Sequence, residues 1–254
     1  MTPETPLADC RQHCRDPAQP DERFRNLWGI KTSAWFMKRN QLMTDTLSAV
    51  RAARAGSMPL ARAHDFLRLR SPAGLILDSS APEWLAASLA RAPWVVVRRG
   101  QILDGIIPIE ARGATKTQRL AALVSIRDVA YRSTPEELSA RRAEPWRAAQ
   151  APALSALARV ARIFARLGES WGPTGSVAFE LATGLPVASR SSDLDLILRR
   201  EESPGAHEAA ELLEDLVQVA SPARLDAVIE TAQGGVSLAD LAVGSRCLFK
   251  ARRR

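Results

Sequence analysis

The segment "SSDLDLILRR", residues 191–200, alternates acidic and apolar side chains, and this alternation constrains the fold more than any other feature. Successive side chains of a β-strand point to opposite faces, so the leucines take one face and Asp193 and Asp195 take the other. The Cα atoms of the two acids would lie roughly 6.5 to 7 Å apart. Because a buried charge must be paired or desolvated at a cost, the segment predicts a strand with one apolar face and one face that forms a polar site.

Length and composition bound the class of protein. The chain has 254 residues, of which 46% are hydrophobic, which is enough for two domains that each bury a core. It contains no apolar run of about 18 residues, and its start lacks the features of a secretory signal. Three cysteines, Cys10, Cys14 and Cys247, cannot form a disulfide framework and suit a reducing compartment. We therefore expect no membrane partner and a cytoplasmic location.

The net charge of +7 is unevenly distributed along the chain. Residues 1–57 carry nine basic and six acidic side chains, residues 58–150 carry fourteen and nine, and the remainder carries twelve and thirteen. The basic excess thus lies outside the acidic strand, as expected if one half grips an anionic substrate while the other holds cations. Arginine outnumbers lysine by 31 to 4, however, so part of this excess could equally reflect overall composition.

Changes in pattern along the chain predict two domains after an extension. Residues 1–57 have little pattern, and "MPLARAHDFLRLR" begins abruptly at Met58. We expect residues 1–57 to be an N-terminal extension, with Met58 as a possible natural start that N-terminal sequencing would test. Residues 58–150 would form a mixed α/β domain and residues 151–254 a second domain, because the segment before residue 150 is rich in proline and charge.

Hydrophobic periodicity and turn residues predict the elements of each domain. In the first domain we expect strands at 64–69, 74–78, 94–100 and 102–113, with a turn at Asp104 and Gly105, and helices at 82–93 and 115–130. In the second we expect helices at 153–168, 177–183, 207–219 and 237–243, a turn at 171–176, and strands at 193–199, 224–231 and 246–250. The fold class is therefore α/β (α+β), and the second domain has a small sheet flanked by helices.

A third carboxylate follows in the strand predicted at 224–231, where Asp226 points away from the apolar face. If the two strands are neighbours, Asp193, Asp195 and Asp226 converge. Carboxylates this close repel one another, and a divalent cation removes that penalty. Mg²⁺ is the natural ion, because it takes one or two carboxylates together with substrate phosphates. Such a triad fits metal-assisted phosphoryl or nucleotidyl transfer.

The turn "GPTGS" supplies a candidate phosphate site. Gly175 would let the backbone approach a phosphate closely, and Ser176 lies where a helix start offers unpaired N–H groups. Each feature has an ordinary explanation as well, because a serine before a helix is commonly a cap and an acidic strand commonly lies at a solvent-facing edge. The ordered combination of turn, helix, acidic strand, helix and third aspartate is much harder to explain in that way.

This ordered set resembles the nucleotidyltransferase superfamily of the polymerase β type. The sixteen residues between Ser176 and Asp193 indicate a particular subfamily. The string "WGPTGSVAFELATGLPVASRSSDLDLIL" closely resembles the malonate decarboxylase holo-acyl-carrier-protein synthases, also called phosphoribosyl-dephospho-CoA transferases. "ARAHDFLRL", "WVVVRRG", "ARGATKTQR" and "RLDAVIETAQGGVSLADLA" add to this resemblance, which covers about residues 58–250.

The resemblance implies an activity, a donor and an acceptor. Such an enzyme transfers 2'-(5''-triphosphoribosyl)-3'-dephospho-CoA to a serine of the malonate decarboxylase acyl-carrier subunit and releases pyrophosphate. The paired aspartates of the family match Asp193 and Asp195, which we expect to bind Mg²⁺, and either could accept the proton of the serine. The role of Asp226 is our inference from strand geometry.

Basic residues would bind the phosphates of such a donor. The segment "ARGATKTQR" offers Arg112, Lys116 and Arg119, and Arg190 precedes the acidic strand. Arginine suits bidentate phosphate contacts, and lysine acts as a point charge. A solvated basic turn explains the same residues equally well.

Two other functions remain open from the sequence alone. One is a basic nucleic-acid-binding module, against which stands the lack of basic repeats with interleaved aromatic residues; a gel shift at physiological salt would detect it. The other is an enzyme of the same fold that transfers a nucleotide from ATP to another protein or small molecule, which competition between ATP and the triphosphoribosyl donor would reveal. Carrier proteins of malonate decarboxylase and citrate lyase are poorly separated by motifs.

Overall fold

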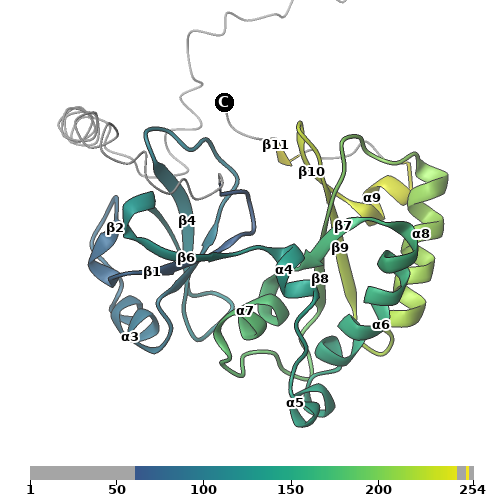
Figure 1. Ribbon diagram of the computed structural model, residues 1–254, viewed down its shortest axis with the longest axis horizontal. Coiled ribbons are helices and arrows are strands. Elements are labelled where there is room, and N and C mark those ends of the chain that lie inside the picture. Colours follow the sequence, from purple (N-terminus) through teal and green to yellow (C-terminus); the bar gives the residue numbers. More distant parts are fainter. Residues whose placement is uncertain (1–60, 245–249, 252–254) are drawn as a thin grey trace, which may run out of the picture. The chain divides into compact units, whose positions relative to one another are not determined.

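Two β-sheets organise residues 61–244 and 250–251, which the computed structural model describes (Figure 1). The first sheet has the strand order β2-β5-β4-β3-β1-β6 and the second has the order β11-β10-β9-β8-β7. Together with the surrounding helices, the two sheets confirm the predicted α/β class. The extension predicted at 1–57 lies outside the described residues, as do Cys247 and most of the strand predicted at 246–250.

The first sheet is entirely antiparallel. Its hydrophobic core contains Leu67, Val95, Ile107 and Ile109, all fully buried. The predicted helix after Pro82 and the predicted turn before the fourth strand are both confirmed. The elements are β1 (Phe66–Leu69), η1 (Pro72–Gly74), β2 (Leu75–Ile76), α3 (Glu83–Arg91), β3 (Trp94–Val97), β4 (Ile106–Arg112), β5 (Arg119–Ser125), η2 (Ile126–Asp128) and β6 (Val129–Ser133).

The helix predicted at 115–130 is wrong, because this segment forms β5, η2 and β6. Strand β5 pairs with β4 along its whole length, from Arg112 opposite Arg119 to Ile106 opposite Ser125. Ala122 and Val124 are buried while their neighbours are less so, which is the two-residue period of a strand. Cross-strand pairing with a long, strongly apolar neighbour therefore overrides the helical spacing of the local sequence.

The second sheet is mixed. Strands β8 and β9 run parallel and are joined through α8, whereas the other pairs are antiparallel. Parallel neighbours need such a crossover connection. The elements that follow β6 are α4 (Pro135–Ser139), α5 (Pro145–Gln150), α6 (Pro152–Leu167), β7 (Ser170–Pro173), α7 (Gly175–Thr183), β8 (Leu194–Arg199), α8 (Ala206–Ala220), β9 (Leu225–Glu230), β10 (Gly234–Ser237), α9 (Leu238–Ala242) and β11 (Lys250–Ala251).

The turn predicted at 171–176 is only partly correct. Residues 170–173 form strand β7, and the sequence pattern also missed β10. Gly172 explains why a strand fits here, since a Cβ at that position would lie 1.9 Å from the backbone oxygen of Pro135. The glycine thus allows β7 to pack directly on α4, a contact that no local pattern reveals.

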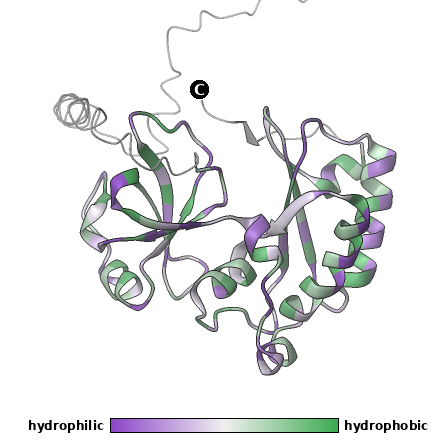
Figure 2. Cartoon of the chain, viewed as in Figure 1, coloured by the Kyte–Doolittle hydropathy of each residue, from purple (hydrophilic) through white to green (hydrophobic). Residues whose placement is uncertain are grey.

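Helices α6 and α8 cover one face of the second sheet (Figure 1). The leucines of β8 point into this layer and are almost completely buried, at Leu194, Leu196 and Leu198. In Figure 2 the sides of these helices that face the sheet are largely hydrophobic. Helix α6 ends at Leu167 and is capped by Gly168 in the left-handed conformation, so the helix predicted at 153–168 is confirmed. Among the described residues, no helix is both long enough and apolar enough to span a membrane.

Two leucines of α6 test this packing. Leu157 is 2% exposed, whereas Leu167, the last residue of the same helix, is 52% exposed. We expect Leu157→Ala to lower the free energy of unfolding by about 2–5 kcal/mol and Leu167→Ala to lower it by less than about 0.5 kcal/mol. Urea unfolding of both variants measures the difference, and equal losses would contradict this packing.

Candidate active site

The acidic residues lie at one end of the parallel strands β8 and β9. Asp195 is directly opposite Asp226 in the register of the two strands, so both side chains project from the same face. Asp193 immediately precedes β8, and its Oδ1 lies 3.6 Å from Nε of Arg224. Asp226 is exposed, while Asp195 is partly buried. The structure thus places the three predicted acids together at the start of two adjacent strands.

The pKa of Asp195 reflects its burial and the two carboxylates beside it. Burial raises the pKa of Asp195 to about 6 from a usual value of 3.8, and the charges of Asp226 and Asp193 act in the same direction. Arg112 and Lys116 act against this rise. The charges of the acid pair and of these two basic residues of the first domain therefore act on each other.

The backbone of the predicted Gly-Ser turn borders Asp195. The N–H of Thr174 donates a hydrogen bond to the backbone oxygen of Asp195 at 2.8 Å. Gly175 has a φ of 61°, and a Cβ there would lie 1.8 Å from Oδ2 of Asp195. Only glycine tolerates both this conformation and this contact. Ser176 follows as the second residue of α7, so the start of this helix lies beside the carboxylate.

The three predicted basic residues of the first domain share one hairpin. Arg112 ends β4 and lies opposite Arg119 of β5. Oε1 of Glu110 accepts from Nε of Arg112 at 3.0 Å and from Nη1 of Arg119 at 3.2 Å. Burial lowers the pKa of Arg112, and Asp195 is among the acids that oppose this shift. Arg112 is 21% exposed and Arg119 is 51% exposed, so both guanidinium groups remain accessible.

Arg190 is placed differently from the other predicted residues. It is exposed in the turn before β8 and lines a hollow of about 470 Å³ together with Arg147 and Gln150 of α5. Within residues 61–244, no hydrogen bond or ion pair joins Arg190 to the acids. Arg112 and Lys116 of the first hairpin are among the charges that act most strongly on the pKa of Asp195.

Sequence reasoning missed a buried ion pair that shapes the approach to the acidic strand. Glu180 of α7 accepts from Nε and Nη2 of Arg147 at 2.8 and 2.9 Å. Its Oε2 also accepts from the N–H groups of Val187 and Ala188. This carboxylate therefore ties α5, α7 and the loop that leads to β8 together. A buried charged residue inside the otherwise apolar "VAFELAT" was the available signal, because such residues require partners.

The donor chemistry of the site suits a hard cation only in part. Within the described ranges, no three histidine, cysteine or carboxylate side chains are grouped closely enough to form a ready-made metal site. Asp195 and Asp226, directly opposite each other in the register, nevertheless match Mg²⁺, which commonly takes one or two carboxylates and completes its shell with water and substrate phosphates. The residues fit a magnesium ion that is bound together with a phosphorylated substrate.

Comparisons with known proteins assign residues 62–135 to the family described as phosphoribosyl-dephospho-CoA transferase MdcG N-terminal domain, and residues 137–254 to the corresponding C-terminal domain. A phosphoribosyl-dephospho-CoA transferase of Pseudomonas putida is 39% identical over 188 residues, which are 74% of this chain and 88% of the relative. Proteins of the same name from Pseudomonas aeruginosa and Klebsiella pneumoniae are 38% and 35% identical, over 75% and 76% of this chain and 86% and 91% of their own lengths. No solved structure matches significantly.

The two sheets and their helices form an α/β fold, and the family matches place the chain in the transferase class of enzymes. More narrowly, the chain belongs to the phosphoribosyl-dephospho-CoA transferase family. The predicted family resemblance is thereby confirmed. The division of the two domains at residue 150 stays a prediction, as do the roles of the individual site residues.

The contact between Gly175 and Asp195 can be isolated with a matched glycine. Gly184 also has a positive φ, of 75°, but no atom lies within 4 Å of its would-be Cβ. Gly184→Ala should therefore cost only the backbone strain, about 1–2 kcal/mol, whereas Gly175→Ala should cost about 1–3 kcal/mol more because the methyl group displaces a carboxylate. Urea unfolding measures both losses. An Asp195→Ala background leaves only the Cβ of that residue, at 3.2 Å, so most of the excess should disappear there, and its full persistence would contradict the contact.

The raised pKa of Asp195 predicts a pH-dependent stability. Its folded pKa of about 6 exceeds the usual 3.8, so its stabilising contribution is complete below pH 3.8 and is lost as pH rises through 6. Asp195→Asn should thus raise the melting temperature above pH 6 in EDTA, by about 2–4 °C for each kcal/mol relieved. The gain should disappear near pH 4. Asp215→Asn, at an exposed position on α8, is the control, and a gain independent of pH would contradict the assignment.

Proposed function

We propose that this chain transfers 2'-(5''-triphosphoribosyl)-3'-dephospho-CoA to a serine of the acyl-carrier subunit of malonate decarboxylase and releases pyrophosphate. The observation that carries the proposal is the registered pair Asp195 and Asp226, and it is supported by the effect of the Arg112 and Lys116 charges on the pKa of Asp195. Carboxylates can bind a metal ion and basic side chains can bind phosphates, so the two together suit a polyphosphate that is bound with a metal ion. Family membership and the names of the relatives support the choice of donor.

The basic hairpin would bind the triphosphate of the donor. Arg112 and Arg119 present guanidinium groups side by side through Glu110, and such groups form bidentate contacts with phosphate oxygens. Lys116 adds a compact charge at the exposed tip between the two strands. At the start of α7, Gly175 and Ser176 offer backbone N–H groups at the positive end of a helix of nine residues.

The reaction is a displacement at the α-phosphorus of the triphosphate. The serine hydroxyl oxygen of the carrier forms a bond to that phosphorus, the bond from the phosphorus to the bridging oxygen breaks, and pyrophosphate leaves with the electron pair. Asp195 or Asp193 accepts the serine proton. Burial raises the pKa of Asp195 to about 6, so near neutral pH it is mostly ionised and still basic enough for this task.

Magnesium completes the proposal as a cofactor. Asp195 and Asp226 would hold it, with Asp193 as a further ligand. When bound, Mg²⁺ neutralises charge on the phosphates and stabilises the departing pyrophosphate. The protein's own contribution is to hold the carboxylates in register and to bring the basic hairpin to the same site. The cytoplasm remains our predicted location for this reaction.

The decisive experiment supplies purified apo-carrier protein and the triphosphoribosyl donor. We expect the wild type to add the prosthetic group, measured as a mass increase of the carrier with stoichiometric pyrophosphate. Asp195→Asn and Asp226→Asn should each lower the rate by about 10²–10⁴-fold while the fold is retained, because each removes a carboxylate from the registered pair. Asp215→Asn on the exposed side of α8 should retain full activity. Turnover like that of the wild type in Asp195→Asn would refute the mechanism.

A further inference from the structure

The face of β8 and β9 that carries the acids also carries a second registered pair. Arg199 lies opposite Glu230, four positions after Asp195 and Asp226 on the same two strands. Because side chains alternate along a strand, residues four apart share a face. The second pair therefore lies about 13 Å from the acids along the strands.

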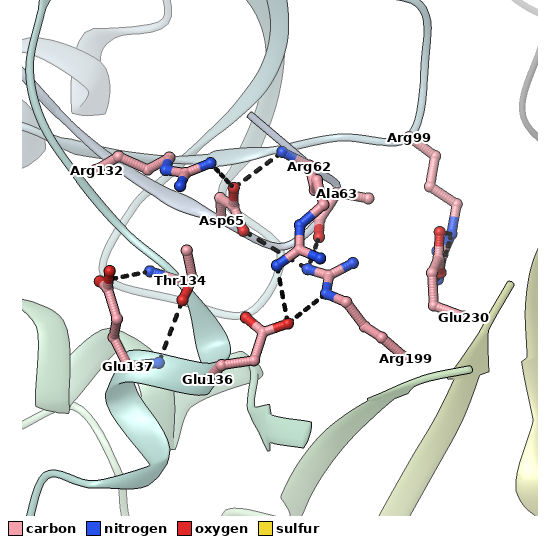
Figure 3. Close-up of polar contacts among 10 residues, drawn as sticks. All are labelled: Arg62, Ala63, Asp65, Arg99, Arg132, Thr134, Glu136, Glu137, Arg199 and Glu230. Atoms are coloured by element: carbon pink, nitrogen blue, oxygen red, sulfur yellow. Dashed lines mark hydrogen bonds and ion pairs between the residues drawn. The ribbon is translucent and has the colours of Figure 1, made fainter. Parts of the chain in front are cut away.

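Both members of this second pair reach residues of the first domain (Figure 3). Arg199 donates from Nε to Oε1 of Glu136 at 2.6 Å and from Nη2 to the backbone oxygen of Ala63 at 2.9 Å. Its Nη2 also lies 3.5 Å from Oδ1 of Asp65. On the neighbouring strand, Glu230 accepts from Nε and Nη2 of Arg99 at 3.0 and 2.6 Å. The two strands thus hold the first domain through opposite charges.

These contacts are shielded from solvent. Asp65 is fully buried and Glu230 is 4% exposed. Burial raises the pKa of Asp65, while its hydrogen bond from the backbone of Arg62 and the nearby charges of Arg132 and Arg199 lower it. A buried ion pair adds little net stability, but breaking it is costly and its geometry is restrictive. Two such contacts on adjacent strands are suited to fixing the position of the first domain relative to β8 and β9.

The contact at Glu230 continues directly into the basic hairpin. Arg99 follows β3, and β3 pairs with β4 through Val96 opposite Glu110. Strand β4 then ends at Arg112. The contact of Arg99 with Glu230 therefore also restrains β4, which carries Arg112 and leads into the hairpin turn with Lys116.

We propose that Arg199 and Glu230 are positioning residues, which hold the first domain on the catalytic face so that the basic hairpin meets the triphosphate bound at the acids. This proposal rests on the proposed function, because it concerns the same site. The two residues touch neither donor nor acceptor. They act through Glu136, Asp65 and Arg99, and their effect should appear selectively in the binding of the polyphosphate.

The neighbouring arginine provides a matched control. Arg200 follows Arg199 and also forms two ion pairs, with Glu169 and Glu208, but both partners belong to the second domain. Arg199→Gln and Arg200→Gln therefore remove the same chemistry from adjacent positions. Only the first substitution releases the first domain. Arg199→Gln removes a partner of the buried Asp65 and could therefore affect folding. Glu230→Gln is the second variant because it leaves Asp65 paired and exposes only Arg99, which has partial access to solvent.

The first measurement is the calorimetric affinity for inorganic tripolyphosphate with Mg²⁺. We expect Arg199→Gln and Glu230→Gln to weaken it about tenfold or more, equivalent to about 1.4 kcal/mol, and Arg200→Gln to change it less than about twofold. The exchanged pair Arg99→Glu with Glu230→Arg should recover part of the affinity. Equal effects at Arg199 and Arg200, or no measurable binding by the wild type, would overturn the proposal.

A second measurement follows the position of the hairpin without any substrate. Spin labels at Ala114 in the hairpin turn and Glu214 on α8, both exposed, report their separation once the native cysteines are replaced by serine. We expect one narrow distance distribution in the wild type and in Arg200→Gln, and a broadened one in Arg199→Gln and Glu230→Gln. Unchanged distributions in the last two would overturn the proposal. If only the proposed function is wrong, the protein should still bind tripolyphosphate, and this binding should still depend on Arg199. No transfer to the carrier protein would then be observed.

Discussion

The parallel pairing of β8 with β9 is the interaction on which the site depends. It places Asp195 opposite Asp226 on one face while the leucines of β8 enter the core beneath α6 and α8. A shift of one residue in this register would turn the acids toward the core and the leucines toward solvent. Because burying unpaired carboxylates costs far more than burying leucines gains, the apolar core fixes the register and thereby the geometry of the acids.

The same pairing brings like charges together, so the site is held at an energetic cost. Burial, together with the charges of Asp226 and Asp193, raises the pKa of Asp195, and the close backbone of Gly175 leaves its carboxylate little room to move away. A divalent cation of the kind proposed for this site would relieve the repulsion between the carboxylates, and this relief would contribute to the free energy of cation binding. Function and stability consequently pull in opposite directions at Asp195.

How much the sequence predicts depends on whether a signal is local. Helix α6 and the acidic face of β8 follow from periodicities that a single segment carries, and Asp226 from the same argument on β9. Strand β5 was missed because its conformation is imposed by β4, and Gly172 because its meaning lies in a contact with α4. The contact from Arg199 to Glu136 joins residues 63 positions apart and has no local pattern at all. Pairing between residues that are distant in the sequence, whether between strands or in ion pairs, could not be predicted from the sequence.

The charge distribution along the chain acquires a physical meaning in this arrangement. Arginines of the first domain divide into those that bind acids of the second domain, such as Arg99, and those that remain accessible in the hairpin, such as Arg119. Arginines paired with buried carboxylates are not available to a ligand. The net charge of the chain therefore overstates its capacity to bind anions. In the proposed function, a polyphosphate would be attracted by the smaller group around Arg112, which shares its partner Glu110 with Arg119 and whose pKa is influenced by Asp195. Specific recognition therefore depends on which basic groups the fold leaves incompletely neutralised, not on how many the chain contains.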